Sequence, residues 1–225
     1  MPAQVRRFIV SAGGAALLGA ALGLAGVRAM DGSSPATTSD RQAPPAYPQP
    51  AEQTDRADHE VDLLIAERAG APPGTIPEFY FEPVGLAIQP GQTVRFNAVM
   101  PHHTVTAYHA QHVKPMRVPE GVPPFSSPII PIGESWSYTF TRPGVYDLWC
   151  GPHEQFGMAM RLVVGEVSGP AAEPPTDFGP AGTLGAAGAV LSDPALAPAR
   201  VLARGRVSWA ELSPASKQPP APEAQ

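Results

Sequence analysis

The sequence predicts an all-β domain, a β-sandwich or a small barrel, and three observations lead to that fold class. Several short segments alternate apolar with polar residues, which is the period of a strand with one buried face. Turn-forming pairs such as Pro-Gly separate these segments, and no helical run of useful length lies between them. Because 30 Pro and 22 Gly occur among the 225 residues, one compact domain is expected.

Three segments carry the alternation most clearly. Residues 92–99 read QTVRFNAV, residues 135–141 read SWSYTFT, and residues 158–164 read MAMRLVV. In each of them every second side chain is apolar or aromatic, so one face of the strand is expected to pack in the core.

The beginning of the chain predicts export. Residues 1–29 carry Arg6 and Arg7 before a mildly apolar stretch at 8–27, and small residues there suit cleavage after Ala29. The paired arginines resemble a twin-arginine signal. An uncleaved membrane anchor is the alternative, since about 20 apolar residues can cross a bilayer. In either case we expect the remainder to be exported, to the periplasm or outside the cell.

Changes in composition divide the rest of the chain, because stretches rich in proline and small residues have too little apolar surface to pack. The packed part should therefore lie in the middle and fold by itself. The expected order is a flexible linker at 30–60, the domain at 61–168, a second flexible linker at 169–193, a possible short helix and strand packing on the domain at 194–213, and a disordered tail at 214–225.

The charge of the chain argues against one class of partner. The formal net charge is -5 and the pI is near 5.6, and no run of Lys or Arg forms a phosphate-binding stripe. We therefore expect no nucleic-acid partner.

Cys150 is the only cysteine, and its surroundings predict a metal site. With His153 and Met158 it forms the pattern C-x2-H-x4-M. A disulfide would need a second cysteine, and a thiol protease would need a nearby histidine base and a pocket, which the sequence neither reveals nor excludes. A thiolate, an imidazole and a thioether from one short loop suit copper. A second imidazole must come from elsewhere.

Four upstream histidines are candidates for that position. His103 shares the face of the apolar residues that follow it, so we expect it to be the ligand, with His102 exposed near the rim. His109 lies six residues after His103. At roughly 3.3 Å per residue of strand, this is too far for both histidines to bind the same ion, so we expect His109 to make a structural hydrogen bond instead. His112 begins a proline-rich loop and is expected to be exposed. A second, weaker copper site among these histidines remains an alternative.

Two stretches together resemble a known family. His-Thr-Val at 103–105 and PGVYDLWCGPHEQFGM at 143–158 are similar to the small blue copper proteins, in the branch of plastocyanin, pseudoazurin and halocyanin. The resemblance covers roughly residues 75–166. It implies a cupredoxin fold, which is a Greek-key sandwich of two sheets. It also implies one type 1 copper, bound by His103, Cys150, His153 and, weakly, Met158.

Two positions near this motif need comment. Many plastocyanins have Asn directly after the first histidine, where it helps to tie the two ligand segments together, but Thr104 stands there in this chain, so the link is left open. Met160 shares the inward parity of Met158 and competes for the axial place. The family spacing favours Met158, and Met160 falls inside a strand where a core role suffices.

The resemblance implies an exported one-electron carrier rather than an enzyme, because four protein ligands leave no open position for a substrate. A copper buffer or delivery protein is the alternative function. Electrons would pass through the edge of His153, where an apolar patch would receive a redox protein, and the carrier is expected to be a monomer. The residues of this predicted patch are Met100, Pro101, Pro152 and Phe156.

Overall fold

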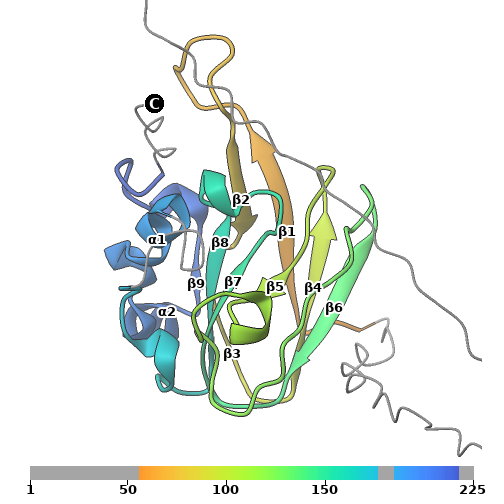
Figure 1. The fold of residues 1–225 in the computed structure, drawn as a ribbon, viewed down its shortest axis with the longest axis vertical. Coiled ribbons are helices and arrows are strands. Elements are labelled where there is room, and N and C mark those ends of the chain that lie inside the picture. Colours follow the sequence, from red (N-terminus) through yellow and green to blue (C-terminus); the bar gives the residue numbers. More distant parts are fainter. Residues whose placement is uncertain (1–55, 177–184, 218–225) are drawn as a thin grey trace, which may run out of the picture. The chain divides into compact units, whose positions relative to one another are not determined.

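Two packed sheets make up most of the computed structural model, which describes residues 56–176 and 185–217 (Figure 1). The fold is a β-sandwich of two sheets, as the sequence predicted. The predicted export signal at 1–29 lies outside the described residues. Among the residues that are described, no helix has both the length and the apolar character needed to cross a bilayer.

The first sheet has four strands in the order β2-β1-β4-β6, with β1 and β4 parallel and the other neighbours antiparallel. Alternate side chains of its strands face the core, as the two-residue period predicted. Its strands are β1 (His59–Ala66), β2 (Glu78–Glu82), β4 (Gln92–Ala98) and β6 (Ser135–Phe140).

The second sheet has five strands in the order β5-β7-β8-β3-β9, and only its β3 and β8 run parallel. Together β4, β6 and β8 account for the three segments that the sequence analysis singled out. The strands are β3 (Gly85–Ile88), β5 (Thr106–Ala107), β7 (Gly144–Trp149), β8 (Ala159–Val164) and β9 (Arg206–Val207).

Short helices fill the connections and the C-terminal part. Figure 1 shows α1, α2 and β9 gathered beside β8 and β3 on one side of the sandwich. The helices are η1 (Ala110–His112), η2 (Glu154–Phe156), η3 (Pro170–Ala172), α1 (Gly185–Leu191), η4 (Pro194–Leu196), α2 (Pro198–Arg204) and η5 (Trp209–Glu211).

The C-terminal segment packs on the domain, and α2 and β9 are the short helix and strand that were expected within 194–213. The end of the core differs from the expected boundary at residue 168. Strand β9 pairs with β3, and a Cβ placed on Gly85 of β3 would lie 2.8 Å from Leu196 and 3.0 Å from Val207. The predicted flexible linker at 169–193 contains η3 and the buried helix α1. The domain therefore closes its core with residues that follow the expected end.

The direction of the strands separates the two ends of the sandwich. The N–H of Asp58 bonds to the carbonyl of Thr93 at the beginning of β4. The metal-binding candidates lie beyond the opposite ends of β4 and β7, at His103 and Cys150. The chain therefore enters the domain at the end away from the candidate site.

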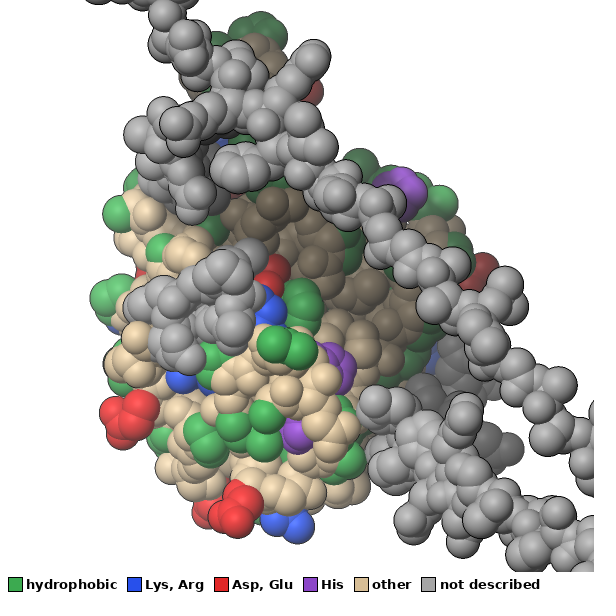
Figure 2. Space-filling model, in the orientation of Figure 1, with side chains coloured by type: hydrophobic (Ala, Val, Ile, Leu, Met, Phe, Trp, Pro, Cys, Tyr) green, Lys and Arg blue, Asp and Glu red, His purple; other side chains and the backbone are tan. Residues whose placement is uncertain are grey.

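The surface gives no sign of a basic stripe on the face that is visible in Figure 2. Lys and Arg side chains are few there and do not gather into one patch. This distribution agrees with the negative net charge of the chain.

Candidate metal centre

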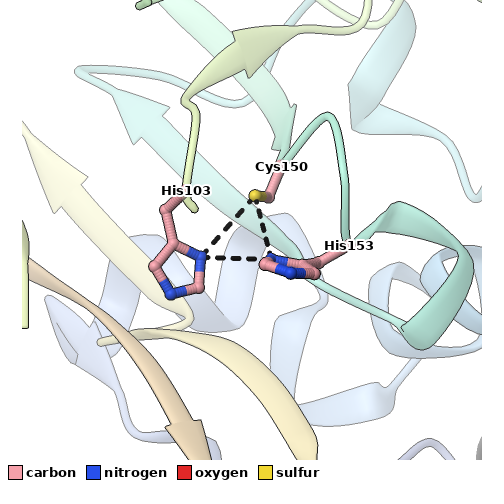
Figure 3. Close-up of side chains that lie close together, drawn as sticks. All are labelled: His103, Cys150 and His153. Carbon is pink, nitrogen blue, oxygen red and sulfur yellow. Dashed lines mark hydrogen bonds between the residues drawn. The ribbon is translucent and has the colours of Figure 1, made fainter. Parts of the chain in front are cut away.

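Three side chains converge at one end of the sandwich. His103 precedes β5, Cys150 follows β7 directly, and His153 begins the turn of η2. Figure 3 shows the three side chains pointing toward one another. Sγ of Cys150 lies 3.7 Å from Nδ1 of His103 and 3.5 Å from Nδ1 of His153, and the two nitrogens are 3.2 Å apart. All three residues are buried.

Backbone hydrogen bonds fix where these side chains start. The carbonyl of His103 accepts the N–H of Ile130 in an isolated bridge, which attaches this segment to the loop before β6. The carbonyl of Cys150 accepts the N–H groups of His153 and Glu154 at 3.0 and 2.9 Å, which closes a tight turn. The turn brings the second imidazole back over the sulfur.

The spacing of the donors fits one metal ion. Ligands at about 2.0–2.3 Å from a common centre, the usual range for imidazole nitrogen and thiolate sulfur, lie roughly 3.2–3.7 Å from one another at near-tetrahedral angles. The three measured separations of 3.2, 3.5 and 3.7 Å match that range. A thiolate with two imidazoles is the donor set that copper electron-transfer sites use, with a long thioether as the axial ligand.

Met158 is the residue that was predicted to supply that thioether. It is fully buried and lies just before β8, whereas Met160 is inside β8 and pairs with Leu148. The carbonyl of Met158 accepts the N–H of Cys150 at 3.1 Å, and its N–H donates to the carbonyl of His153 at 3.2 Å. Its backbone is thus bonded to the two other members of the C-x2-H-x4-M pattern.

Burial sets the protonation of the three groups. It lowers the pKa of both His103 and His153 to about 4, so that both imidazoles are neutral at pH 7 and keep a lone pair for a metal. Burial raises the pKa of the Cys150 thiol to about 11, and the N–H of Thr104 acts in the opposite direction. A bound cation is therefore needed to hold this sulfur as a thiolate at neutral pH.

Thr104 supplies the link between the two ligand segments that the sequence left open. Its backbone N–H donates to Sγ of Cys150 at 3.3 Å, and its hydroxyl accepts the N–H of Gly151 at 2.7 Å. One residue next to His103 therefore contacts both the sulfur and the loop that carries His153. A hydroxyl does here what the resemblance assigned to an asparagine.

Aromatic rings cover His153. Phe79 of β2 stacks on the imidazole with 4.3 Å between ring centroids and 24° between planes, and Phe156 stacks on Phe79 at 5.0 Å. The His153 side of the site thus has an apolar cover. The sequence analysis did not identify Phe79, because the short strand EFYFE was not among the segments that it singled out.

A buried polar cluster adjoins the ligand turn and was also missed. Glu154, the residue after His153, accepts the hydroxyl of Tyr108 at 2.8 Å and pairs with Lys114 at 2.6 Å. The ammonium group of Lys114 also lies 5.1 Å from the ring centroid of Trp149. These contacts fasten η2 to the proline-rich loop after β5. A lysine in that loop and a glutamate in the motif gave no signal that they pair.

The other histidines lie where the sequence placed them, with one exception. His102 is exposed and His109 is buried. Nδ1 of His109 accepts the N–H of Gln111 at 3.1 Å, and a hydrogen bond to the backbone of Val122 occupies the ring further, which favours a structural role. His112 was expected to be exposed but is partly buried, 6.4 Å from the ring of His109. Among the described residues, one group of His, Cys, Asp and Glu side chains has ligand atoms close enough together to hold a metal ion, and it is the group around Cys150.

Comparison with known proteins indicates copper, as the donor set does. Residues 73–165 match the family described as copper binding proteins of the plastocyanin/azurin family. The chain is 34% identical over 110 residues to a pseudoazurin of Paracoccus pantotrophus and 34% identical over 110 residues to a putative pseudoazurin of Rhizobium leguminosarum bv. viciae. Each match covers 49% of this chain. They span 65% and 62% of those relatives, just under two thirds of their length.

Two further similarities extend this picture. A chloroplastic plastocyanin of Hordeum vulgare is 33% identical over 109 residues, which are 46% of this chain and 61% of that protein. Among solved structures, a pseudoazurin from Sinorhizobium meliltoi is 31% identical, with coverage of 49% of this chain and 75% of that chain and a TM-score of 0.38.

Proposed function

We propose that this protein carries single electrons between redox partners through one type 1 copper, because residues 73–165 match the plastocyanin/azurin family of copper binding proteins. The proposed ligands are His103, Cys150, His153 and, more weakly, Met158. The observation that carries the proposal is that Nδ1 of His103, Sγ of Cys150 and Nδ1 of His153 lie within 4.8 Å of one another and that all three residues are buried.

The surrounding residues support electron transfer by limiting rearrangement. Copper, when bound, supplies the one-electron chemistry. The Cys150–His153 turn, the Thr104 hydrogen bonds and the bridge to Ile130 hold the donor atoms near one another, so little movement is required between oxidation states. Neutral imidazoles and a sulfur that already accepts an N–H are ready to bind.

The same arrangement disfavours an enzyme. Three buried donors and the thioether of Met158 would surround the ion, which leaves no coordination position for a substrate. Type 1 centres in copper oxidases are accompanied by histidines on both sides of the cysteine, whereas Trp149 and Gly151 flank Cys150.

We propose that the redox partner docks over His153. Pro152 is exposed beside it, and Met100, Pro101 and Phe156 are partly buried, so apolar atoms are available for a brief contact. The acidic chain would act as a monomer and outside the cytoplasm, as the pattern of its first 29 residues indicates. The partner, the direction of electron flow and a membrane tether through residues 8–27 need direct tests.

An absorption spectrum of the Cu(II) protein tests the proposal. We expect a strong visible thiolate-to-copper band, one copper per chain and reversible one-electron voltammetry. Cys150→Ser should remove the band, and His103→Ala should open the site to added imidazole. His102→Ala is the matched control, since this neighbouring histidine is exposed, and its spectrum should stay unchanged. Loss of the band in His102→Ala but not in His103→Ala would show that the wrong histidine was chosen.

A copper buffer or delivery protein is the second candidate. It would use the same loop but would release copper quickly to a chelator and have a pale Cu(II) form. The buried donors and the rings over His153 favour slow release. A pale protein that exchanges copper within the mixing time would replace the carrier with the buffer.

A further inference from the structure

We propose that the C-terminal residues 206–217 hold strand β2 so that Phe79 stays stacked on His153, which makes Trp209 a positioning residue for that ligand. The inference rests on the proposed function, because His153 matters most as a copper ligand. It concerns a segment that lies beyond the part of the chain matched by the copper-protein family, residues 73–165.

Trp209 contacts three residues on the outer face of β2. Its indole N–H donates to Oε2 of Glu78 at 2.8 Å, and its backbone N–H donates to Oε2 of Glu82 at 2.8 Å. Its ring stacks on Tyr80, with 5.1 Å between centroids and 11° between planes. These residues, at positions 78, 80 and 82, are every second residue of the strand.

The inner face of the same strand carries the ring that covers the ligand. Phe79 and Phe81 are buried between the outer residues, and Phe79 lies 4.3 Å from the ring centroid of His153. Because successive side chains of a strand point to opposite faces, fixing the outer face fixes the position of the inner rings. Glu78 and Tyr80, which Trp209 contacts, are therefore the two neighbours of Phe79, which contacts His153.

Strand β2 needs such a restraint because it is the edge of its sheet. It has one hydrogen-bonded neighbour, β1, in the order β2-β1-β4-β6. A second attachment comes from Arg68, just beyond β1, which donates to the carbonyl of Lys217 at 2.6 Å and pairs with Glu78 at 3.5 Å. The C-terminal segment is thus bonded to both sides of the β1–β2 hairpin.

The expected consequence follows from what Phe79 excludes. An apolar ring on the imidazole keeps water away, and a less polar surrounding disfavours the more highly charged oxidised ion. If β2 moves outward, water gains access to His153. The oxidised state should then be favoured, and copper should leave more easily.

Trp209→Ala in the full chain tests this coupling. We expect a lower reduction potential than in the wild type and copper transfer to a chelator that is about tenfold faster, the scale seen when groups that orient a ligand are removed. In the metal-free protein, NMR should show the ring protons of His153 losing the ring-current shift caused by Phe79. Trp209→Phe keeps a ring over Tyr80, so its potential, copper transfer rate and His153 resonances should be close to those of the wild type.

Two comparisons make the test decisive. Val201→Ala removes a buried side chain of the same C-terminal part that packs on β3 near Gly85, so it should lower stability and leave the potential and the His153 resonances unchanged. Phe79→Leu should reproduce the effects of Trp209→Ala, and adding Trp209→Ala to it should change nothing more.

An unchanged potential and unchanged His153 resonances in Trp209→Ala would overturn the inference, as would full additivity with Phe79→Leu. A wild type without copper colour would instead refute the proposed function, and the metal-free NMR result would still stand.

Discussion

At the scale of single residues, Thr104 is the side chain that joins the two halves of the candidate site. Its hydroxyl accepts the N–H of Gly151, and its own N–H donates to Cys150. The two hydrogen bonds come from different atoms of one residue, so a substitution can remove the first and keep the second.

Thr104→Val should therefore loosen the ligand turn without removing the hydrogen bond to sulfur. The N–H of Gly151 loses its acceptor, at a cost of about 1 kcal/mol, and its hydrogen exchange should become faster by about fivefold to tenfold. Exchange measured by NMR provides the check, and Thr104→Ser should retain the slow rate. Thr139→Val, which removes a hydroxyl bonded to Thr93 between β4 and β6, is the control. Equal exchange in all variants would mean that Thr104 does not hold the turn.

The two buried imidazoles predict how the metal-free protein responds to pH. Their pKa values are about 4 in the folded chain and near 6.5 in an unfolded one, so the unfolded state binds more protons between those values. The stability of the metal-free protein should fall as pH decreases from about 6.5 toward 4. Urea unfolding at several pH values measures this, and a bound metal should suppress the loss because it occupies the same nitrogens. His102→Asn should keep most of the dependence, because burial is the largest cause of both lowered pKa values and the charge of His102 a smaller one. A flat profile in the wild type would contradict the assignment.

Strand parity predicted that the side chain of His103 faces inward, but in the fold a different feature orients this side chain. Parity assumes a continuous strand, but β5 covers only Thr106–Ala107, and His102 has a left-handed φ of 65°. The bridge between His103 and Ile130 directs the imidazole inward. A pairing partner 27 positions further along the chain has no signature in the sequence around His103.

At the scale of elements, a buried ion cluster joins β7, β8 and the loop after β5. Asp147 is fully buried and accepts hydrogen bonds from Arg117 at 2.7 Å and from Arg161 at 2.8 and 3.0 Å. The guanidinium groups also donate to the carbonyls of Glu173 and Leu196. Asp147 therefore holds the C-terminal part against the sheet.

Asp147→Asn should be among the most destabilising polar substitutions in the domain. It leaves two buried guanidinium groups without their shared carboxylate, and the loss of one partner of a buried pair costs about 3–5 kcal/mol. Chemical unfolding gives the difference. Glu60→Gln, which removes a carboxylate paired with Arg95 at 3.6 Å and largely exposed, should cost less than about 1 kcal/mol. A similar small loss in both variants would show that the cluster is not buried in solution.

The sequence predicted β4, β6 and β8 because their two-residue alternation is strong. It did not predict α1, and composition explains this failure. The helix reads GAAGAVL, with Gly188 in its middle, so neither helix propensity nor an amphipathic pattern distinguishes it from a linker. Packing on η2 and β8 stabilises it instead. The Asp147 cluster was hidden for a related reason, since its partners are brought together only by the tertiary fold.

At the scale of the whole described domain, the C-terminal part is needed to complete the core. Leu196, Val201 and Val207 are fully buried in the same cluster as the strands of both sheets. Residues 61–168 alone would expose these contacts, together with the edge of β3 that pairs with β9.

A chain shortened to residues 61–168 should therefore fail to unfold cooperatively or to retain copper, whereas residues 56–217 should behave like the full protein. Loss of three buried aliphatic side chains, at about 1.5–3 kcal/mol each, is comparable to the whole stability of many domains, which is about 5–15 kcal/mol. Circular dichroism during heating and copper content after dialysis distinguish the two. Cooperative unfolding and full copper content in the 61–168 chain would restore the boundary expected from composition.

The two ends of the described chain differ in how they can be used for attachment. Residue 58 bonds beside the start of β4, at the end of the sandwich away from His103, whereas Lys217 bonds to Arg68 of the β1–β2 hairpin. An electrode linker or fusion partner joined before residue 56 would leave the copper end facing outward. The same addition after residue 217 would crowd the hairpin that carries Phe79. A biosensor built on this domain should accordingly be immobilised through its amino end.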